Sequence, residues 1–331
     1  MGAGGRLRKG VTYTAGLVAD DPGAKYAVES VEIWVRRCAA RMDEAGLFFG
    51  HGTDNAWDEA AWLVLHVLGA PLDGGFTDWD RPVTTEEAAR IAALLAERIG
   101  ERRPLAYLLG EAWFCGLRFV AGPAALVPRS PLAALIADGF RPWVSAAPRR
   151  VLDLCTGGGC LAVAIAKHMA PEQVDAVDLS EEALALAREN VTLHGVQDRV
   201  RLLRSDLFAA LDGARYDLVV TNPPYVPAGR LRALPAEYAA EPSLGLVSGE
   251  DGLVLPLRIL HDAPVHLVPG GVLVCEVGES ENALQAALPR VPLTWIEFEQ
   301  GGGGVFTIGR QQLEAARSDV AAALEQRGHV V

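Results

Sequence analysis

The sequence predicts an α/β fold, a doubly wound sheet preceded by a small helical domain. Three stretches support this prediction. Residues 151–154 form a short apolar strand that leads into a glycine turn and an apolar helix. Residues 174–178 form a second strand that ends in an acid, and residues 216–221 form a β-branched strand that stops at two prolines. A strand, a glycine turn and a helix in this order begin the nucleotide-binding half of such sheets.

The sequence pattern of the N-terminal third of the chain predicts helices. Residues 1–25 are glycine-rich and aperiodic, and we expect a loose tail there. Residues 26–105 are expected to form a helical domain, in which a capping-box pattern at 84–87 opens the third helix. The expected helices, each followed by a glycine or proline stop, span residues 28–45, 57–68 and 91–99.

Residues 106–130 predict a β-hairpin and a linker. Aromatic residues, including Phe114, return here with short-strand character, and we expect the hairpin to turn at Gly122-Pro123. The next domain is expected over residues 131–310, and residues 311–331 should form a polar terminal helix and tail. Beyond the stretches described first, strands are predicted at 200–203, 272–277, 295–298 and 305–308, and helices at 160–168, 181–194, 253–267 and 280–288.

Composition narrows the class of protein. The 331 residues are 50% hydrophobic and 22% charged, which predicts a packed core rather than disorder. The net charge of -12 argues against a protein that tracks along DNA through phosphate contacts, so no stable nucleic-acid binding is expected. Five scattered cysteines, no apolar run that could span a bilayer and no signal-peptide pattern predict a cytoplasmic protein without membrane contact.

The glycine turn and the acids around it predict a cofactor site. A glycine turn after the first strand and an acid after the second are shared by dinucleotide and S-adenosylmethionine enzymes. The full Gly-x-Gly-x-x-Gly pattern is absent, and Asp153 suits a ligand bearing a sulfonium and an ammonium better than one bearing two phosphates. Asp206 is expected to meet the adenine amino group. The predicted cofactor-binding residues are Asp153, Cys155, Thr156, Gly157, Gly158, Gly159, Asp178, Asp206, Leu207 and Asn222. No metal-ligand spacing is present, and no metal is expected.

A rigid turn follows the fourth strand of the sheet. Asn222, Pro223, Pro224 and Tyr225 form it, because neither a strand nor a helix runs through two prolines. Asn222 offers a side-chain carbonyl, Pro223 a main-chain carbonyl and Tyr225 an aromatic face. Two neutral acceptors beside a ring suit a planar group that bears NH2, namely an amide, adenine or cytosine. Taken alone, Asn-Pro-Pro favours the interpretation as an ordinary loop start, and only the rest of the chain changes that.

Together the glycine turn, Asp178, Asp206 and the Asn-Pro-Pro-Tyr turn resemble the HemK-type protein-glutamine methyltransferases. The resemblance covers roughly residues 26–310. It implies a Rossmann-like class I fold, S-adenosyl-L-methionine as cofactor and the side-chain amide nitrogen of a glutamine as methyl acceptor. It also implies Asn222, Pro223 and Tyr225 as catalytic residues. The substrate-binding residues that it implies are Asn222, Pro223, Pro224, Tyr225 and Phe114.

Within this family the chain resembles the branch that acts on large-subunit ribosomal protein L-three (PrmB type). The matching stretches are Gly-His-Gly-Thr-Asp-Asn at 50–55, Trp-Asp-Glu at 57–59, Ala-Trp-Phe-Cys-Gly at 112–116 and Val-Pro-Arg-Ser-Pro at 127–131. The release-factor branch instead carries Arg-Pro-x-Thr-Glu, where this chain has Arg-Ser-Pro-Leu-Ala at 129–133. The resemblance therefore implies ribosomal protein L-three as the partner.

Three alternatives remain open from the sequence. The first is the same chemistry on the glutamine of a peptide chain release factor. The second is an exocyclic-amino nucleic-acid methyltransferase, which would want a basic recognition face that a net charge of -12 does not favour. The third is a non-catalytic ribosome-assembly factor that has kept the pocket. Such a factor would bind the cofactor without yielding S-adenosylhomocysteine.

Overall fold

The computed structural model describes residues 29–144, 147–299 and 302–329. The chain divides into two compact units, and the division falls between Leu109 and Gly110. The expected loose tail at 1–25 lies outside the described residues. The hairpin expected at 106–130 belongs to the second unit, together with the sheet.

The described part of the first unit is helical, and side-chain caps set the starts of its three long helices. Ser30 caps α1, Asn55 caps α2, and Thr84 with Glu87 forms the capping box of α3 that the sequence predicted. A short helix, α4, follows the third and was not predicted. The helices are α1 (Val31–Glu44), α2 (Ala56–Leu68), α3 (Thr85–Glu101) and α4 (Leu105–Leu109).

A buried ion pair lies inside this helical unit. Nε of Arg98 on α3 donates to Glu59 on α2 at 2.7 Å, and both side chains are almost fully removed from solvent. Arg98 also donates to the carbonyl of Phe48. Two charges buried in this way require each other, because removing one would leave the other uncompensated. The pair therefore fixes α3 against α2.

The predicted hairpin exists, but its turn was misplaced. Strands β1 (Glu111–Phe114) and β2 (Leu117–Val120) pair antiparallel and turn at Cys115 and Gly116, not at Gly122-Pro123. Cys115 has φ 50° and Gly116 has φ 73°. Two consecutive positive φ angles match the twist of a two-residue hairpin, whereas Pro123 follows the strands. The sequence argument missed the turn because cysteine seldom takes a positive φ.

In the described part of the second unit, seven strands form one sheet in the order β5-β4-β3-β6-β7-β9-β8. The first five of these pair in parallel, and β9 pairs antiparallel with both β7 and β8. The order reverses between β3 and β6, which is where open α/β sheets place ligands. The strands are β3 (Arg150–Leu154), β4 (Gln173–Asp178), β5 (Val200–Arg204), β6 (Tyr216–Thr221), β7 (Leu267–Glu276), β8 (Thr294–Trp295) and β9 (Val305–Gly309).

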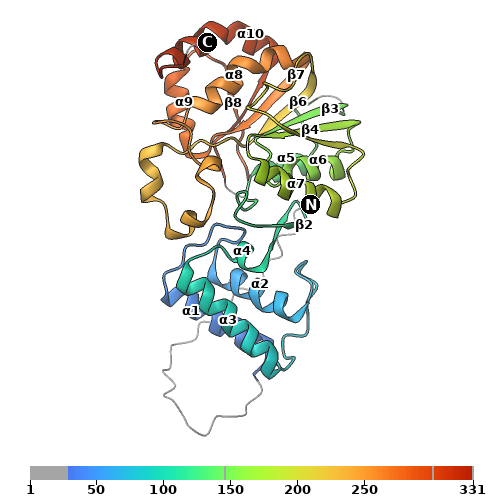
Figure 1. Cartoon of the computed structure of the whole chain (residues 1–331), viewed down its shortest axis with the longest axis vertical. Coiled ribbons are helices and arrows are strands. Elements are labelled where there is room, and N and C mark those ends of the chain that lie inside the picture. Colours follow the sequence, from blue (N-terminus) through green and yellow to red (C-terminus); the bar gives the residue numbers. More distant parts are fainter. Residues whose placement is uncertain (1–28, 145–146, 300–301, 330–331) are drawn as a thin grey trace. The chain divides into compact units, whose positions relative to one another are not determined.

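Helices cover both faces of this sheet (Figure 1). Alternate strand residues feed two separate cores: Leu152 and Val219 pack into one, whereas Val151 and Leu218 pack into the other. Helices α8, α9 and α10 line the first core, and α5 and α6 line the second, to which the end of α7 adds Val191. The helices are α5 (Leu132–Ala137), α6 (Cys160–His168), α7 (Glu181–Leu193), α8 (Val254–His266), α9 (Glu281–Ala287) and α10 (Arg310–Glu325). The predicted doubly wound, Rossmann-like sheet is confirmed.

Three details of this sheet differ from the prediction. Strand β7 starts at Leu267 rather than 272, and the strand predicted at 295–298 is the two-residue β8. The terminal helix α10 is not simply polar. It buries one apolar face, which includes Leu313, Val320 and Leu324, and it contacts α8 and β7. Helix α10 therefore belongs to the layer that covers the sheet.

A long connection links β6 to α8 and forms part of the wall of a cavity. It contains the 3-10 turns η1 (Ala228–Ala233), η2 (Ala236–Ala240) and η3 (Ser243–Gly245). Val226 and Val247 form an isolated bridge that closes it into a loop. A fourth turn, η4 (Gly278–Ser280), follows β7. We call residues 227–248 the connecting loop.

Candidate active site

The glycine turn after β3 is built from residues with positive φ. Cys155 has φ 57°, Gly157 φ 54° and Gly159 φ 80°. The main-chain N–H of Gly157 donates to Asp178 Oδ2 at 2.8 Å, which ties the turn to the end of β4. A Cβ at Gly159 would lie 3.1 Å from the Cβ of Ala187, so this glycine lets the start of α6 approach α7. Gly159 therefore serves packing.

Asp153 lies in the interior just behind the turn. Its side chain is fully buried and accepts from the Thr156 hydroxyl at 2.5 Å and from the Ala162 N–H at 3.1 Å. Its other oxygen, Oδ1, has no partner among the described residues. Burial raises the pKa of Asp153 to about 7, against the two hydrogen bonds that lower it, and the charge of Asp178 raises it further. This carboxyl group lacks a compensating cation.

Asp178 ends β4 at the same edge of the sheet. It accepts from the N–H groups of Gly157 and Ser180, at 2.8 and 2.9 Å. Burial nevertheless raises its pKa, and the main-chain hydrogen bonds only oppose that rise. Two acids whose ionised forms the chain leaves under-stabilised suit a cationic ligand. Both the sulfonium and the ammonium of S-adenosylmethionine meet this requirement, whereas a diphosphate would be repelled.

The Asn-Pro-Pro-Tyr turn follows β6, on the other side of the point where the strand order reverses. The Thr221 hydroxyl donates to the Leu154 carbonyl at 2.8 Å and fixes the end of β6 against β3. Pro223 and Pro224 are buried, whereas Asn222 and Tyr225 are partly exposed. Within the described part of the chain no hydrogen bond involves the Asn222 side chain, so its amide is available to a ligand.

Tyr225 is held at three points. Its main-chain carbonyl accepts from the Ser280 hydroxyl at 2.7 Å, and its own hydroxyl donates to Glu276 Oε1 at 3.2 Å. Its ring lies against Gly278, where a Cβ would sit only 2.7 Å from a ring carbon. Burial and the charge of Glu276 raise the pKa of Tyr225 above its usual range, so the hydroxyl keeps its proton. The orientation of this ring is therefore set by the last residue of β7 and by residues that follow it.

A cavity of about 880 Å³ brings the predicted residues together. Asp153 lies behind the wall and Gly159 does not line it. Asp206, which was expected to meet adenine, lines the cavity and also pairs with Arg258 at 3.0 Å. The predicted residues that line the cavity are Phe114, Cys155, Thr156, Gly157, Gly158, Asp178, Asp206, Leu207, Asn222, Pro223, Pro224 and Tyr225.

Comparison with known proteins places the chain in a family. Two family models match, the PrmC N-terminal domain over residues 34–110 and the Methyltransferase small domain over residues 140–234. The ribosomal protein uL3 glutamine methyltransferase of Xanthomonas campestris is 51% identical over 85% of this chain and 91% of its own length. That of Xylella fastidiosa strain 9a5c is 47% identical over 94% and 99%. The chain belongs to the ribosomal protein uL3 glutamine methyltransferase family.

This membership confirms the family and the branch predicted from the sequence. A solved methyltransferase from Pyrococcus furiosus is similar in structure, with a TM-score of 0.46 and 20% identity over 67% of this chain and 98% of that one.

Sequence reasoning missed part of the cavity wall. The stretch at 128–131, expected to be a linker, lines the cavity. Arg129 donates to both carboxylate oxygens of Glu241, at 2.7 and 2.6 Å, and its guanidinium lies over the Tyr238 ring. Glu241 is buried, so this ion pair ties the connecting loop to residue 129.

Glu276 is the second omission. It is the last residue of β7, and its Oε2 accepts from the Ser130 hydroxyl at 2.5 Å. A signal for it was present in the sequence: like Asp178, it is an acid that follows an apolar strand.

Among the described residues no three His, Cys, Asp or Glu side chains gather as a metal site requires. None of the helices within residues 29–144, 147–299 and 302–329 combines the length and apolarity needed to span a membrane.

Proposed function

We propose that this protein transfers a methyl group from S-adenosyl-L-methionine to the side-chain amide nitrogen of a glutamine in ribosomal protein uL3. The observation that carries the proposal is the meeting, in one cavity, of an acidic glycine turn and the Asn-Pro-Pro-Tyr turn. The chain around them is 51% identical to a ribosomal protein uL3 glutamine methyltransferase.

Residues after three neighbouring strands would hold the cofactor. Asp178 would accept from the ribose hydroxyls, and Asp206 with Leu207 would border the adenine. Residues 155–158 would let the backbone approach, since Gly157 already has the positive φ that this needs. Asp153 would supply negative charge behind the turn. When bound, the cofactor supplies a methyl group on a positively charged sulfur.

The Asn-Pro-Pro-Tyr turn would hold the target amide. An amide nitrogen is a poor nucleophile because its lone pair is delocalised into the carbonyl. The Asn222 side-chain oxygen and the Pro223 carbonyl would each accept one of its N–H groups, orient the nitrogen and favour positive charge building there. Tyr225 and Phe114 would pack the flat faces. The cavity of about 880 Å³ lies near the upper end of the roughly 300–1,000 Å³ common for ligand pockets, which leaves room for two ligands.

The surfaces beside the cavity, rather than the turn, must select the protein substrate. Both uL3 and a release factor would present the same glutamine amide. At 129–133 this chain lacks the threonine and glutamate typical of the release-factor branch, and Ser130 instead contacts Glu276. A net charge of -12 would also speed encounter with a basic ribosomal protein at low salt. We place the reaction in the cytoplasm, where such a substrate is made, without stable binding to nucleic acid.

A competition experiment tests the proposal. Purified uL3 and a purified release factor are mixed at equal concentration with limiting enzyme and labelled cofactor, and mass spectrometry locates the methyl group. We expect a methylated glutamine in uL3 at the higher kcat/KM. An equal or higher kcat/KM for the release factor would move the substrate assignment to the other branch. Absence of S-adenosylhomocysteine with either substrate would favour a non-catalytic assembly factor.

A further inference from the structure

Glu276 occupies an unusual position for an acid. It is 5% exposed and both of its carboxylate oxygens accept hydrogen bonds. The Tyr225 hydroxyl donates to Oε1 at 3.2 Å, and the Ser130 hydroxyl donates to Oε2 at 2.5 Å. The Ser130 oxygen itself accepts from the Leu132 N–H at 3.1 Å, which leaves its hydrogen for Glu276. Both bonds have the direction that an ionised carboxylate requires.

The charge on Glu276 has little compensation nearby. Within the described part of the chain it forms no ion pair, because Arg129, the nearby cation, already binds both oxygens of Glu241. The Cys275 thiol precedes it on β7, and Tyr238 lies against Arg129. Burial raises the pKa of Glu276 to about 7, although Ser130, Tyr225 and Arg129 lower it. The group therefore changes charge near neutral pH.

We propose that Glu276 is a positioning residue for methyl transfer: its carboxylate accepts the Tyr225 hydroxyl hydrogen and so holds the Tyr225 ring where the target amide packs. This inference rests on the proposed function. Gly278 and Ser280 fix the other side of the ring and its main chain, so Glu276 controls the hydroxyl end.

Protonation would weaken this arrangement. A neutral carboxyl carries one O–H donor that needs an acceptor in this buried position, so we expect one of its two hydrogen bonds to reverse direction. The Ser130 bond is the shorter of the two at 2.5 Å and the Ser130 oxygen already accepts from Leu132, so the 3.2 Å bond to Tyr225 is the one that we expect to reverse. The Tyr225 hydroxyl then exchanges a charge-assisted bond to a carboxylate for a weaker neutral one, so the ring is held less firmly. Transfer should therefore be fast above the pKa of Glu276 and slow below it, with the loss occurring as the pH falls through about 7.

The experiment measures kcat and KM for both substrates from about pH 5 to about pH 9, with full-length protein and purified uL3. The wild-type kcat should fall on the acid side of about 7. Glu276→Gln should lower kcat on the order of tenfold at high pH and abolish that inflection, with an unchanged KM for the cofactor. Ser130→Ala removes a bond that lowers the pKa of Glu276, so its inflection should move to higher pH.

Two further variants separate positioning from general destabilisation. Glu172→Gln removes the carboxylate of an exposed pair with Arg149 and should match the wild-type profile. In a Tyr225→Phe background, Glu276→Gln should have no additional effect on kcat, because the hydroxyl that it positions is gone.

Outcomes for the two proposals are distinguishable. If the wild-type protein methylates no glutamine at any pH, the proposed function is wrong. Wild-type turnover with the same acid inflection in Glu276→Gln would overturn the role of Glu276 and leave the proposed function standing. If Glu276→Gln does not fold, the position of the Ser130→Ala inflection decides: an unmoved inflection rejects the proposal.

Discussion

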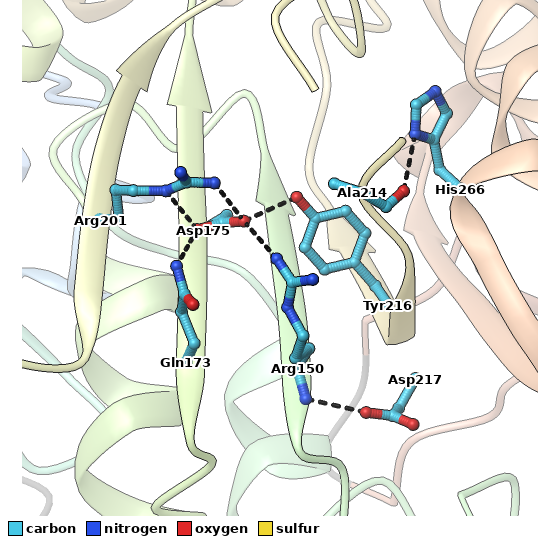
Figure 2. A network of polar contacts seen from close by, with 8 residues as sticks. All are labelled: Arg150, Gln173, Asp175, Arg201, Ala214, Tyr216, Asp217 and His266. Carbon is cyan, nitrogen blue, oxygen red and sulfur yellow. Dashed lines mark hydrogen bonds and ion pairs between the residues drawn. The ribbon is translucent and has the colours of Figure 1, made fainter. Parts of the chain in front are cut away.

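Two aspartates, Asp153 on β3 and Asp175 on β4, are both fully buried in the sheet but are treated in opposite ways. Asp175 accepts two hydrogen bonds from Arg201 at 2.8 Å, one from the Tyr216 hydroxyl at 2.7 Å and one from Gln173 at 2.7 Å. Arg150 adds an ion pair at 3.4 Å. Figure 2 shows these side chains converging on Asp175. They come from β3, β5 and β6 and from β4 itself.

Asp153 and Asp175 differ in whether the protein itself supplies the groups that stabilise the buried negative charge. Burial alone would raise the pKa of Asp175, but hydrogen bonds from Arg201 and Tyr216 and the charge of Arg201 outweigh it, so the pKa is lowered. Among the described residues Asp153 has no cation and keeps one oxygen without a partner, and its pKa is raised to about 7. The chain thus compensates one buried charge within the sheet and leaves the other without a cation among the described residues, and we propose that a bound cationic cofactor supplies it. Acids left incomplete at the carboxyl ends of strands mark the site.

The largest expected effect comes from Asn222, whose side chain forms no hydrogen bond with the described residues. Asn222→Ala should lower kcat a hundredfold or more, because an orienting acceptor is lost, while cofactor affinity stays nearly intact. Asn222→Asp keeps the shape and one acceptor but adds a charge. Steady-state kinetics and calorimetry on the same preparations check this. Methylation by Asn222→Ala at the parental rate would show that the turn does not act on the amide.

The next largest effect tests Asp175, whose buried charge is stabilised by its own protein partners. Asp175→Asn should cost about 3 kcal/mol of unfolding free energy, at the low end for a broken buried pair because Arg201 and Arg150 can still reach water. Urea unfolding measures the cost. Calorimetry under folding conditions should give wild-type cofactor affinity, since this network does not line the cavity. A large loss of affinity at unchanged stability would reverse the roles assigned to the two acids.

A smaller effect is expected at Asp178, whose ionised carboxylate the fold does not fully stabilise. Asp178→Ala should weaken cofactor binding by on the order of 2–3 kcal/mol, through loss of charge-assisted hydrogen bonds. Stability should change little, because the pKa of Asp178 is raised in the folded chain. Titration calorimetry and urea unfolding measure the two quantities. Unchanged affinity would remove Asp178 from the cofactor site.

The sequence predicted the features whose signals are local. The glycine turn, Asp178 and the Asn-Pro-Pro-Tyr turn each stand at the end of a recognisable strand, and the capping box at 84–87 lies within four residues. The wall contacts that were missed join distant residues. Ser130 and Glu276 are 146 positions apart, and Arg129 and Glu241 are 112 apart.

The acids inside the sheet show the same limit. Asp153 and Asp175 both stand within apolar strands and look alike in the sequence. Only the register of β4 beside β5 places Arg201 opposite Asp175 and so distinguishes them. Such pairings arise when strands assemble, and no local pattern encodes them.

The smallest expected effect is the pH dependence of the unfolding free energy. It tests the comparison between Asp153 and Asp175 most directly. The folded chain holds the Asp153 proton more tightly than the unfolded chain, whose aspartates titrate near about 4. The stability that Asp153 contributes is therefore present below about pH 4 and is lost as the pH rises through about 7. The lowered pKa of Asp175 gives the opposite sign: its contribution is present above about pH 4 and is lost in more acid solution.

Urea unfolding from about pH 3 to about pH 8 without cofactor measures both slopes, each limited to about 1.4 kcal/mol per pH unit for one proton. Between about pH 4 and about pH 7, Asp153→Asn should lose less stability than wild type as the pH rises. Below about pH 4, Asp175→Asn should lose less than wild type as the pH falls. Each variant serves as the control for the other, because both replace one buried carboxylate in the same sheet. If the unfolding free energies of wild type and Asp153→Asn run parallel between about pH 4 and about pH 7, the folded chain does not raise the pKa of Asp153. The distinction between the two acids would then fail.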